Sequence, residues 1–410
     1  MLDLKNKIEK TIFREKYLKN IDEVLKLRLI NVIVWPRRVG KSYFLYSVLK
    51  YLLEKNKVEF NQIFYVNKEW SEFDEINDYE SLKDFFLKQK INKNKTFFVW
   101  LDEVQEIEWW EKFVLDIYSK YENAIIYITW SNSKLLSSKY STLLSGRYLE
   151  KIIYPLDFKE FCQFSWKEPS KKIFYEYLEF GWLPKIPFIK DFELRYDYLN
   201  WVYNTVFTKD VVEFFRIRNV SILRKINKYL FKELGALFTA NNIAKYFKSQ
   251  KINVSVDTVL NYLEYSKSAF LFSEIERYDL KWKKILEVNS KIYSFDLWIR
   301  NSVVWFNLVW DIEKFLELVV LNFLLSNWYK VNIWVLDNKE IDFVANKNWK
   351  IIYIQVCYLL SDKKVIDREF WNLLEIKDNY EKIVLSLDEL PLSDYKWIRH
   401  YNLIDFILNN

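Results

Sequence analysis

The sequence predicts an α/β protein that begins with a parallel sheet covered by helices. A short β-branched run, residues 31–35, passes directly into a loop and then into a helix with regularly spaced apolar residues. A second apolar run, residues 96–101, ends in two adjacent acids, and strands alternate with helices again over residues 290–410. Strands that alternate with helices in this way are typical of a parallel sheet with helices on both faces.

Composition narrows the class of protein. The 410 residues are enough for two or three domains at about 150 residues each, and 51% hydrophobic with 29% charged residues indicates a globular chain. No run approaches the ~18 apolar residues of a membrane helix, and the first residues lack the apolar segment of a signal peptide. We therefore expect a cytoplasmic protein that contacts no membrane.

Cysteine, histidine and charge counts exclude several kinds of site. Two cysteines and the single His400 are too few for a zinc cluster, a disulfide framework or histidine-based catalysis. The net charge of +6, from 62 basic and 56 acidic residues, is too small to indicate nucleic-acid binding by itself. Function must therefore be argued from motifs.

The first motif comprises residues 35–42, directly after the first strand. It matches the phosphate-binding pattern G-x-x-x-x-G-K-S/T at every position except the first, where Trp35 stands for glycine. Backbone N–H groups of such a loop cradle phosphates, the Lys41 ammonium reaches the β- and γ-phosphates, and the Ser42 hydroxyl binds Mg²⁺. The motif predicts a nucleotide-binding loop made of Trp35, Pro36, Arg37, Arg38, Val39, Gly40, Lys41 and Ser42.

The second motif is the pair of acids Asp102 and Glu103, which follows the apolar run. At the end of a strand beside a phosphate-binding loop, Asp102 is expected to hold Mg²⁺ and Glu103 to polarise the attacking water. A further strand, residues 62–66, separates this pair from the first motif along the chain. The extra strand and the glutamate indicate the additional-strand class of P-loop ATPases.

A third strand, residues 124–128, leads to the last two candidates of this region. It runs into Thr129-Trp-Ser-Asn-Ser, where Asn132 is the candidate that senses the γ-phosphate. The alternative is an ordinary turn in which Asn132 and the serines are local caps. Arg147, after a Leu-Ser-Gly sequence, is the candidate arginine finger, acting in the same chain or from a neighbouring subunit.

These motifs together resemble a known family, and the resemblance covers nearly the whole chain. The chain is similar to prokaryotic AAA-type ATPases of the AAA+ superfamily, which carry a C-terminal domain of unknown function. The resemblance implies ATP and Mg²⁺ as cofactors and hydrolysis of ATP to ADP and phosphate. Its segments are WPRRVGKS (35–42), LDEVQE (101–106), TWSNS (129–133), LSGR (144–147), YPLDFKEF (154–161), FGWLP (180–184), FDLWIRN (295–301), EIDFV (340–344) and IQV (354–356).

Tryptophan stands at many positions where the family or the local turn calls for glycine. The chain has 18 tryptophans and 4 glycines, whereas average usage would give about 29 glycines. We hypothesise that UGA codons, which some bacterial lineages decode as glycine, have been read as tryptophan; the alternative is a diverged, inactive protein whose tryptophans are all genuine. Trp110 is expected to be genuine, and Trp70, Trp100 and Trp166 are left undecided. The suspect positions are Trp35, Trp109, Trp130, Trp182, Trp282, Trp298, Trp310, Trp328, Trp349 and Trp371.

The chain is expected to divide into four segments: a P-loop ATPase core over residues 1–155, a helical lid over 156–220, a winged-helix-like region over 221–290 and an α/β domain over 291–410. In the third segment Thr239 and Ser255 are predicted N-caps of two helices. Residues 269–272 and 278–286 are expected to form a wing hairpin with Trp282 at its turn. DNA could contact the second of these helices, but it has few basic residues, which favours an internal packing module.

The last segment has the layout of the PD-(D/E)xK restriction-endonuclease fold. Glu317 lies on a predicted helix, and Asp342 and Gln355 lie on successive predicted strands. Carboxylates in these positions bind Mg²⁺ in such nucleases, and a lysine orients water. Here Cys357 occupies the lysine position, so we expect the fold with weak or absent cleavage; the alternative is a site completed by another lysine, such as Lys350.

The sequence therefore predicts a Mg²⁺-dependent ATPase. The alternative is a nucleotide-gated switch that binds DNA or another protein, and an active nuclease is the third reading. ATP is the expected partner, DNA is a candidate partner through the winged-helix region, and assembly into a homo-oligomer is left open.

Overall fold

The computed structural model describes residues 2–34, 36–55, 58–130, 144, 146–279, 284–336, 339–390 and 395–410. It forms two compact units, Met1–Ile153 and Tyr154–Asn410, and each is described here by itself. Within the described residues, no helix combines the length and the apolar character needed to span a membrane.

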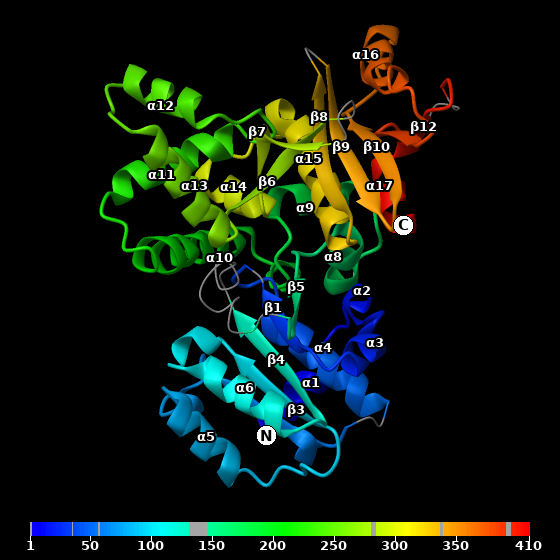
Figure 1. The fold of residues 1–410 in the computed structure, drawn as a ribbon. Helices are drawn as coiled ribbons and strands as arrows, with labels where there is room; N and C mark the ends of the chain where they lie inside the picture. The colour runs from blue at the N-terminus through cyan, green and yellow to red at the C-terminus, as the bar shows by residue number, and fades with distance from the viewer. Residues whose placement is uncertain are drawn as a thin grey trace. The chain divides into compact units, whose positions relative to one another are not determined.

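The first unit contains a five-stranded sheet in the order β2-β3-β4-β1-β5 (Figure 1). All four strand pairs are parallel, which confirms the sheet predicted from the sequence. β4 therefore lies between β1 and β3, the two strands that precede the predicted motifs. The strands are β1 (Ile30–Val34), β2 (Ile63–Asn67), β3 (Phe97–Asp102), β4 (Ala124–Trp130) and β5 (Tyr148–Ile152).

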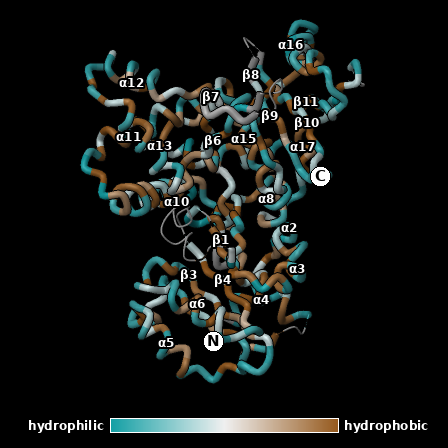
Figure 2. The backbone as a smooth tube through the Cα atoms, viewed as in Figure 1, coloured by the Kyte–Doolittle hydropathy of each residue, from teal (hydrophilic) through white to brown (hydrophobic). Residues whose placement is uncertain are grey.

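Apolar side chains hold this sheet inside the unit. Every residue of β1 and β3 is buried, and Figure 2 shows hydrophobic residues along the central strands. Among the helices, α1 packs against α4 and α5 packs against α6. The helices are α1 (Leu2–Glu9), α2 (Glu15–Leu18), α3 (Ile21–Lys26), α4 (Lys41–Glu54), α5 (Tyr79–Lys88) and α6 (Trp110–Lys120).

The second unit begins with helices. Thr239 and Ser255 cap α12 and α13 as predicted: their hydroxyl oxygens accept the amides of Asn242 and Thr258 at 3.2 and 3.1 Å. A π-helical segment, η6 (Val206–Glu213), continues α10. The helices of this part are α8 (Phe158–Ser165), α9 (Lys171–Phe180), α10 (Phe192–Thr205), α11 (Val220–Lys232), α12 (Ala240–Ser249), α13 (Val256–Ser268) and α14 (Leu297–Val303).

A seven-stranded mixed sheet follows, in the order β12-β11-β10-β9-β8-β6-β7. Its strands are β6 (Phe272–Asp279), β7 (Lys284–Ser294), β8 (Lys330–Leu336), β9 (Lys339–Lys347), β10 (Lys350–Val356), β11 (Glu381–Ser386) and β12 (Arg399–Asn402). The accompanying helices are α15 (Leu308–Ser326), α16 (Lys363–Leu374) and α17 (Leu403–Asn409). α15 packs against β8, β9 and β10.

The hairpin of β6 and β7, expected as the wing of a winged helix, extends this C-terminal sheet. β6 lies beside β8, with Arg277 opposite Ile333, and the boundary expected at residue 290 falls inside β7. A two-stranded hairpin is only marginally stable alone, so addition to a sheet edge stabilises it. Trp282, expected at its turn, lies outside the described residues. The winged-helix and nuclease-fold assignments stay predictions.

Tryptophan is strongly enriched where the backbone is left-handed. Thirteen non-glycine residues of the described chain have positive φ, and five of them are tryptophan: Trp109, Trp166, Trp328, Trp349 and Trp397, with φ between 54° and 73°. L-residues with a Cβ atom are disfavoured in this region, and glycine is not. By contrast, Trp182 and Trp298 do not have positive φ. In the FGWLP turn, Gly181 takes the left-handed conformation, at φ 73°.

Candidate functional site

The loop after β1 has the backbone of an anion cradle. Arg38 and Gly40 are left-handed, at φ 69° and 94°, with Val39 between them buried in the core. Gly40 is the N-cap of α4, and its carbonyl accepts the amide of Phe44 at 2.9 Å. When left-handed and right-handed residues alternate at the N-terminus of a helix, their successive backbone N–H groups point toward one place, where a phosphate can bind. Trp35 and the side chains of Lys41 and Ser42 lie outside the described part of the structure.

Asp102 is the last residue of β3 and Glu103 follows it, and one hydroxyl contacts both residues. Asp102 is 1% exposed and Glu103 is 3% exposed. The Thr129 hydroxyl donates to Oδ1 of Asp102 and accepts the backbone N–H of Glu103 at 3.0 Å. Glu103 is itself left-handed, at φ 57°, and its Oε2 accepts from Nε2 of Gln105. Glu103 therefore has an unfavourable backbone conformation and is held by hydrogen bonds at both its backbone and its side chain. Such residues are typical of functional sites.

The parallel sheet places the loop and the acids at the same edge. The loop leaves the carboxyl end of β1, the acids leave the carboxyl end of β3, and Thr129 lies near the carboxyl end of β4 between them. Open α/β sheets bind ligands outside this edge. Backbone N–H groups can hold phosphates here and the carboxylate of Asp102 is a ligand suited to Mg²⁺, so the residues present fit a nucleotide with its cation.

Sequence reasoning missed Thr129 and Gln105. Thr129 is a hydroxyl residue near the end of an otherwise apolar strand, which was a usable signal. Gln105 lies two residues after Glu103, and its side chain returns to the acid through the short 3-10 turn over Val104–Glu106. Asn132, the predicted γ-phosphate sensor, lies outside the described residues.

Arg147 is not brought to this edge. It precedes β5, and its carbonyl accepts the amide of Ile30 at the start of β1, at 2.8 Å. The phosphate loop leaves the other end of β1, about 16 Å away for five residues of extended chain. The parallel order places Arg147 at the amino ends of the strands, which argues against a finger within the same chain, and its role stays a prediction.

The predicted nuclease residues lie in the second unit, and two of them share a partner. The ammonium of Lys291, on β7, lies 3.6 Å from Oε2 of Glu317 and 3.7 Å from Oδ1 of Asp342. Gln355 instead donates from Nε2 to Oε2 of Glu369 at 3.1 Å. Lys350, the lysine suggested from the sequence, is exposed at the turn between β9 and β10, and the lysine in contact with Glu317 and Asp342 is Lys291.

Cys357, at the position of the nuclease lysine, is buried beside the same sheet. Burial, followed by the nearby Glu369, raises the pKa of its thiol above the usual value. The thiol therefore stays neutral at physiological pH and does not supply the positive charge of a lysine.

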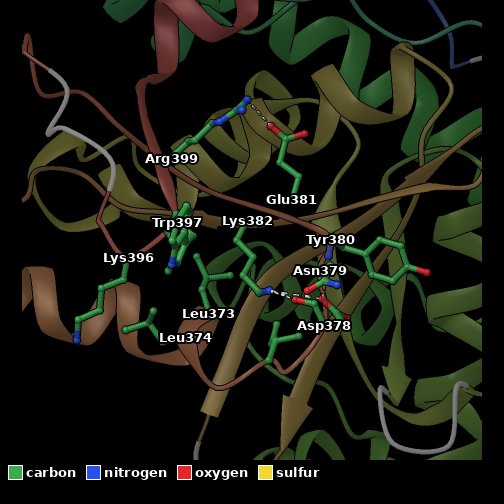
Figure 3. Close-up of a pocket in the computed structure, with 12 residues that line it drawn as sticks. Leu373, Leu374, Asp378, Asn379, Tyr380, Glu381, Lys382, Lys396, Trp397 and Arg399 are labelled. Atoms are coloured by element: carbon green, nitrogen blue, oxygen red, sulfur yellow. Dashed lines mark hydrogen bonds and ion pairs between the residues drawn. The ribbon is translucent and has the colours of Figure 1, made fainter.

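A separate hollow of about 810 Å³ lies at the other end of the C-terminal sheet (Figure 3). Two of its basic residues pair with two of its acidic residues: Lys382 lies 3.4 Å from Asp378, and Arg399 lies 3.3 Å from Glu381. Trp397, on its rim, is one of the left-handed tryptophans. None of the residues predicted for catalysis lines this hollow.

Comparison with known proteins is consistent with this geometry. A family model described as an AAA domain matches residues 27–162, and a model described as a domain of unknown function (DUF8612) matches residues 171–308. An uncharacterized protein of Haemophilus influenzae is 30% identical over 401 residues, 97% of this chain and 98% of its own length. Another, of Methanocaldococcus jannaschii, is 30% identical over 427 residues, covering 94% of this chain and 88% of its own length.

One solved structure shares the fold of much of the chain. A Walker-type ATPase of Pyrococcus abyssi superposes with a TM-score of 0.50 at 16% identity, covering 72% of this chain and 96% of the other. At this identity the likeness concerns the fold alone.

Proposed function

The chain is an AAA-type P-loop ATPase, of the family that also contains the two relatives just described, and on this premise we propose that it binds Mg²⁺–ATP and hydrolyses ATP to ADP and phosphate. The observation that supports the proposal best is the hydroxyl of Thr129, which contacts both acids at the edge from which the phosphate loop emerges. Burial of a carboxylate costs free energy, so two buried acids are not explained by the stability of the core. A functional role accounts for them better.

Each residue has a separate role in this proposal. The backbone N–H groups of residues 37–40 and the Lys41 ammonium bind the phosphates, and Ser42 and Asp102 would hold Mg²⁺. The bound cation would neutralise charge that develops on the phosphate oxygens. Glu103 orients the attacking water, and Asn132 contacts the γ-phosphate.

Thr129 and Gln105 are positioning residues for the two acids. Thr129 fixes the Asp102 carboxylate and the amide of Glu103, and Gln105 fixes the Glu103 carboxylate. Arg147 could reach a nucleotide only from a neighbouring subunit, which makes its role dependent on assembly.

The test is a pair of glutamine variants within one motif. Glu103→Gln should retain ATP binding and lose hydrolysis, because the amide cannot polarise water as a carboxylate does. Glu106→Gln is the matched control: Glu106 is exposed three residues further on and should keep full turnover. Undiminished turnover in Glu103→Gln would remove Glu103 from the proposed role.

The second proposal is that ATP acts as a switch for a DNA or protein partner. Ser255, the N-cap of α13, and Asn261 on α13 lie exposed, and α13 is the helix that would contact DNA if the winged-helix region binds it. ATP-dependent retention of a DNA duplex without sustained turnover would favour the switch over the ATPase. Retention that is independent of nucleotide would argue against it.

We further propose that the left-handed tryptophans are glycine in the protein made by the cell, through UGA decoding. The supporting observation is that five turns of the described chain place tryptophan where glycine has no steric penalty. Mass spectrometry of peptides from the native protein should find glycine at positions 109, 166, 328, 349 and 397. Trp110, buried and without positive φ, is the control that should remain tryptophan.

A further inference from the structure

The second unit contains a buried lysine surrounded by acids from two other elements. Lys291, on β7, is 3% exposed. Its ammonium contacts Glu317 of α15 and Asp342 of β9, and it forms an ion pair with Glu340, also of β9. Two of these acids are residues that the sequence suggested as ligands of a nuclease metal ion.

Other hydrogen bonds already hold both of these acids. The Tyr293 hydroxyl donates to Oε2 of Glu317 at 2.8 Å, and the amide of Val356 donates to Oδ2 of Asp342 at 2.9 Å. Each of the two carboxylates therefore accepts a hydrogen bond from one uncharged donor and also contacts the Lys291 ammonium.

Gln355, the third residue of the expected nuclease set, belongs to a different network. Its Nε2 atom donates to Glu369, and Nη2 of Arg368 lies 2.6 Å from Oε1 of the same glutamate. The three expected ligands are thus divided between two sets of partners.

Electrostatics keeps the ammonium charged in this position. Burial lowers the pKa of Lys291, but the combined attraction of Glu317, Asp342 and Glu340 is stronger, and the net pKa is raised above the usual value of lysine. Burial raises the pKa of Glu317 and of Asp342, and the Lys291 ammonium opposes both of these shifts. A cation placed among the same carboxylates would meet this positive charge at close range. Within the ranges that the structure describes, no group of three acidic, histidine or cysteine side chains is arranged to hold a metal ion.

We infer that the ammonium of Lys291 takes the place of a divalent cation in this site, so that Lys291, Glu317, Glu340 and Asp342 form a fixed ion network and not a metal centre. The network joins β7 to α15 and β9, and thereby fastens the hairpin of β6 and β7 to the C-terminal domain. A buried ion pair of this kind fixes how elements meet more than it adds to stability. The C-terminal domain then cleaves no nucleic acid, whether or not the first unit hydrolyses ATP.

The test is titration of the full chain with Mn²⁺, with free Mn²⁺ followed by electron paramagnetic resonance. All proteins carry Lys41→Ala, which removes the nucleotide site from the measurement. The parent protein, which carries Lys41→Ala alone, should bind the same amount of Mn²⁺ as the variant that also carries Asp342→Asn. The double variant Lys291→Gln with Glu340→Gln, which keeps the net charge of the network, should gain a Mn²⁺ site that Asp342→Asn abolishes.

Lys267→Gln is the matched control. Lys267 lies in the same unit and also pairs with two glutamates, Glu264 and Glu274. Because the side chain of Glu264 is 53% exposed and not held inside the fold, loss of Lys267 should create no Mn²⁺ site. Mn²⁺ binding by the parent that depends on Asp342, or Mn²⁺-dependent cutting of DNA or RNA by the parent, would overturn the inference. A folded double variant that gains no site would also overturn it. If circular dichroism shows the double variant unfolded, the two measurements on the parent decide.

Discussion

Replacing exposed left-handed tryptophans with glycine should stabilise the protein. Trp166, Trp349 and Trp397 are 81%, 93% and 96% exposed, so their removal forfeits little apolar burial. An L-residue in the left-handed conformation destabilises the folded state by roughly 1–2 kcal/mol. Replacement by glycine recovers only part of this, because glycine is more flexible than tryptophan in the unfolded chain. We expect a gain of about 1 kcal/mol at each site and about 3 kcal/mol for the triple variant, because the sites lie in separate turns.

The assay is urea unfolding of the full chain, followed by circular dichroism. The triple variant should shift the unfolding midpoint to higher urea. Trp305→Gly is the control: it is 88% exposed but lies outside the left-handed region, so glycine should cost roughly 0.5–1 kcal/mol there. If the triple variant loses stability as the control does, the steric argument is refuted, and with it the main structural support for glycine at these positions.

Three further predictions follow from single contacts. Thr129→Val should lower ATP turnover roughly tenfold to hundredfold with nucleotide binding retained, and Thr129→Ser should restore it; unchanged turnover in Thr129→Val would contradict the positioning role. Asp296→Ala leaves the backbone amides of Trp182 and Trp298 without their buried acceptor, so it should lower the free energy of unfolding, measured in urea, by about 2–4 kcal/mol. A loss below about 0.5 kcal/mol, which is the size of a surface substitution, would contradict this expectation. Burial lowers the pKa of His400, so the unfolded chain binds more protons and stability should fall as the pH drops below about 6.5. His400→Gln should flatten this dependence, and an unchanged slope would contradict the assignment.

The phosphate loop could be predicted from the sequence because its determinants are local. A buried strand, a loop ending in Gly40 and a helix that begins at Lys41 are all fixed by neighbouring residues, and the structure has them in place. The N-caps Thr239 and Ser255 are local in the same sense, and both were found.

Contacts that depend on the order of strands could not be predicted in this way. Thr129 meets Asp102 because β4 lies between β1 and β3, and Arg147 is far from the loop because β5 is parallel to β1. Lys291 belongs to a strand expected in part as a wing, and only its addition to the C-terminal sheet brings it to Asp342. The spacing of residues along the sequence does not indicate which strands pair with one another.

The measurement that tests the central claim most directly is calorimetric titration of the full chain with Mg²⁺–ATP. It should be made on the chain with glycine at position 35, the first position of the phosphate-binding pattern, and on the same chain with Lys41→Ala. The account predicts saturable heat of binding in the first protein and none in the second. Absence of binding in both proteins, or equal binding in both, would contradict the assignment of residues 35–42 as the nucleotide site.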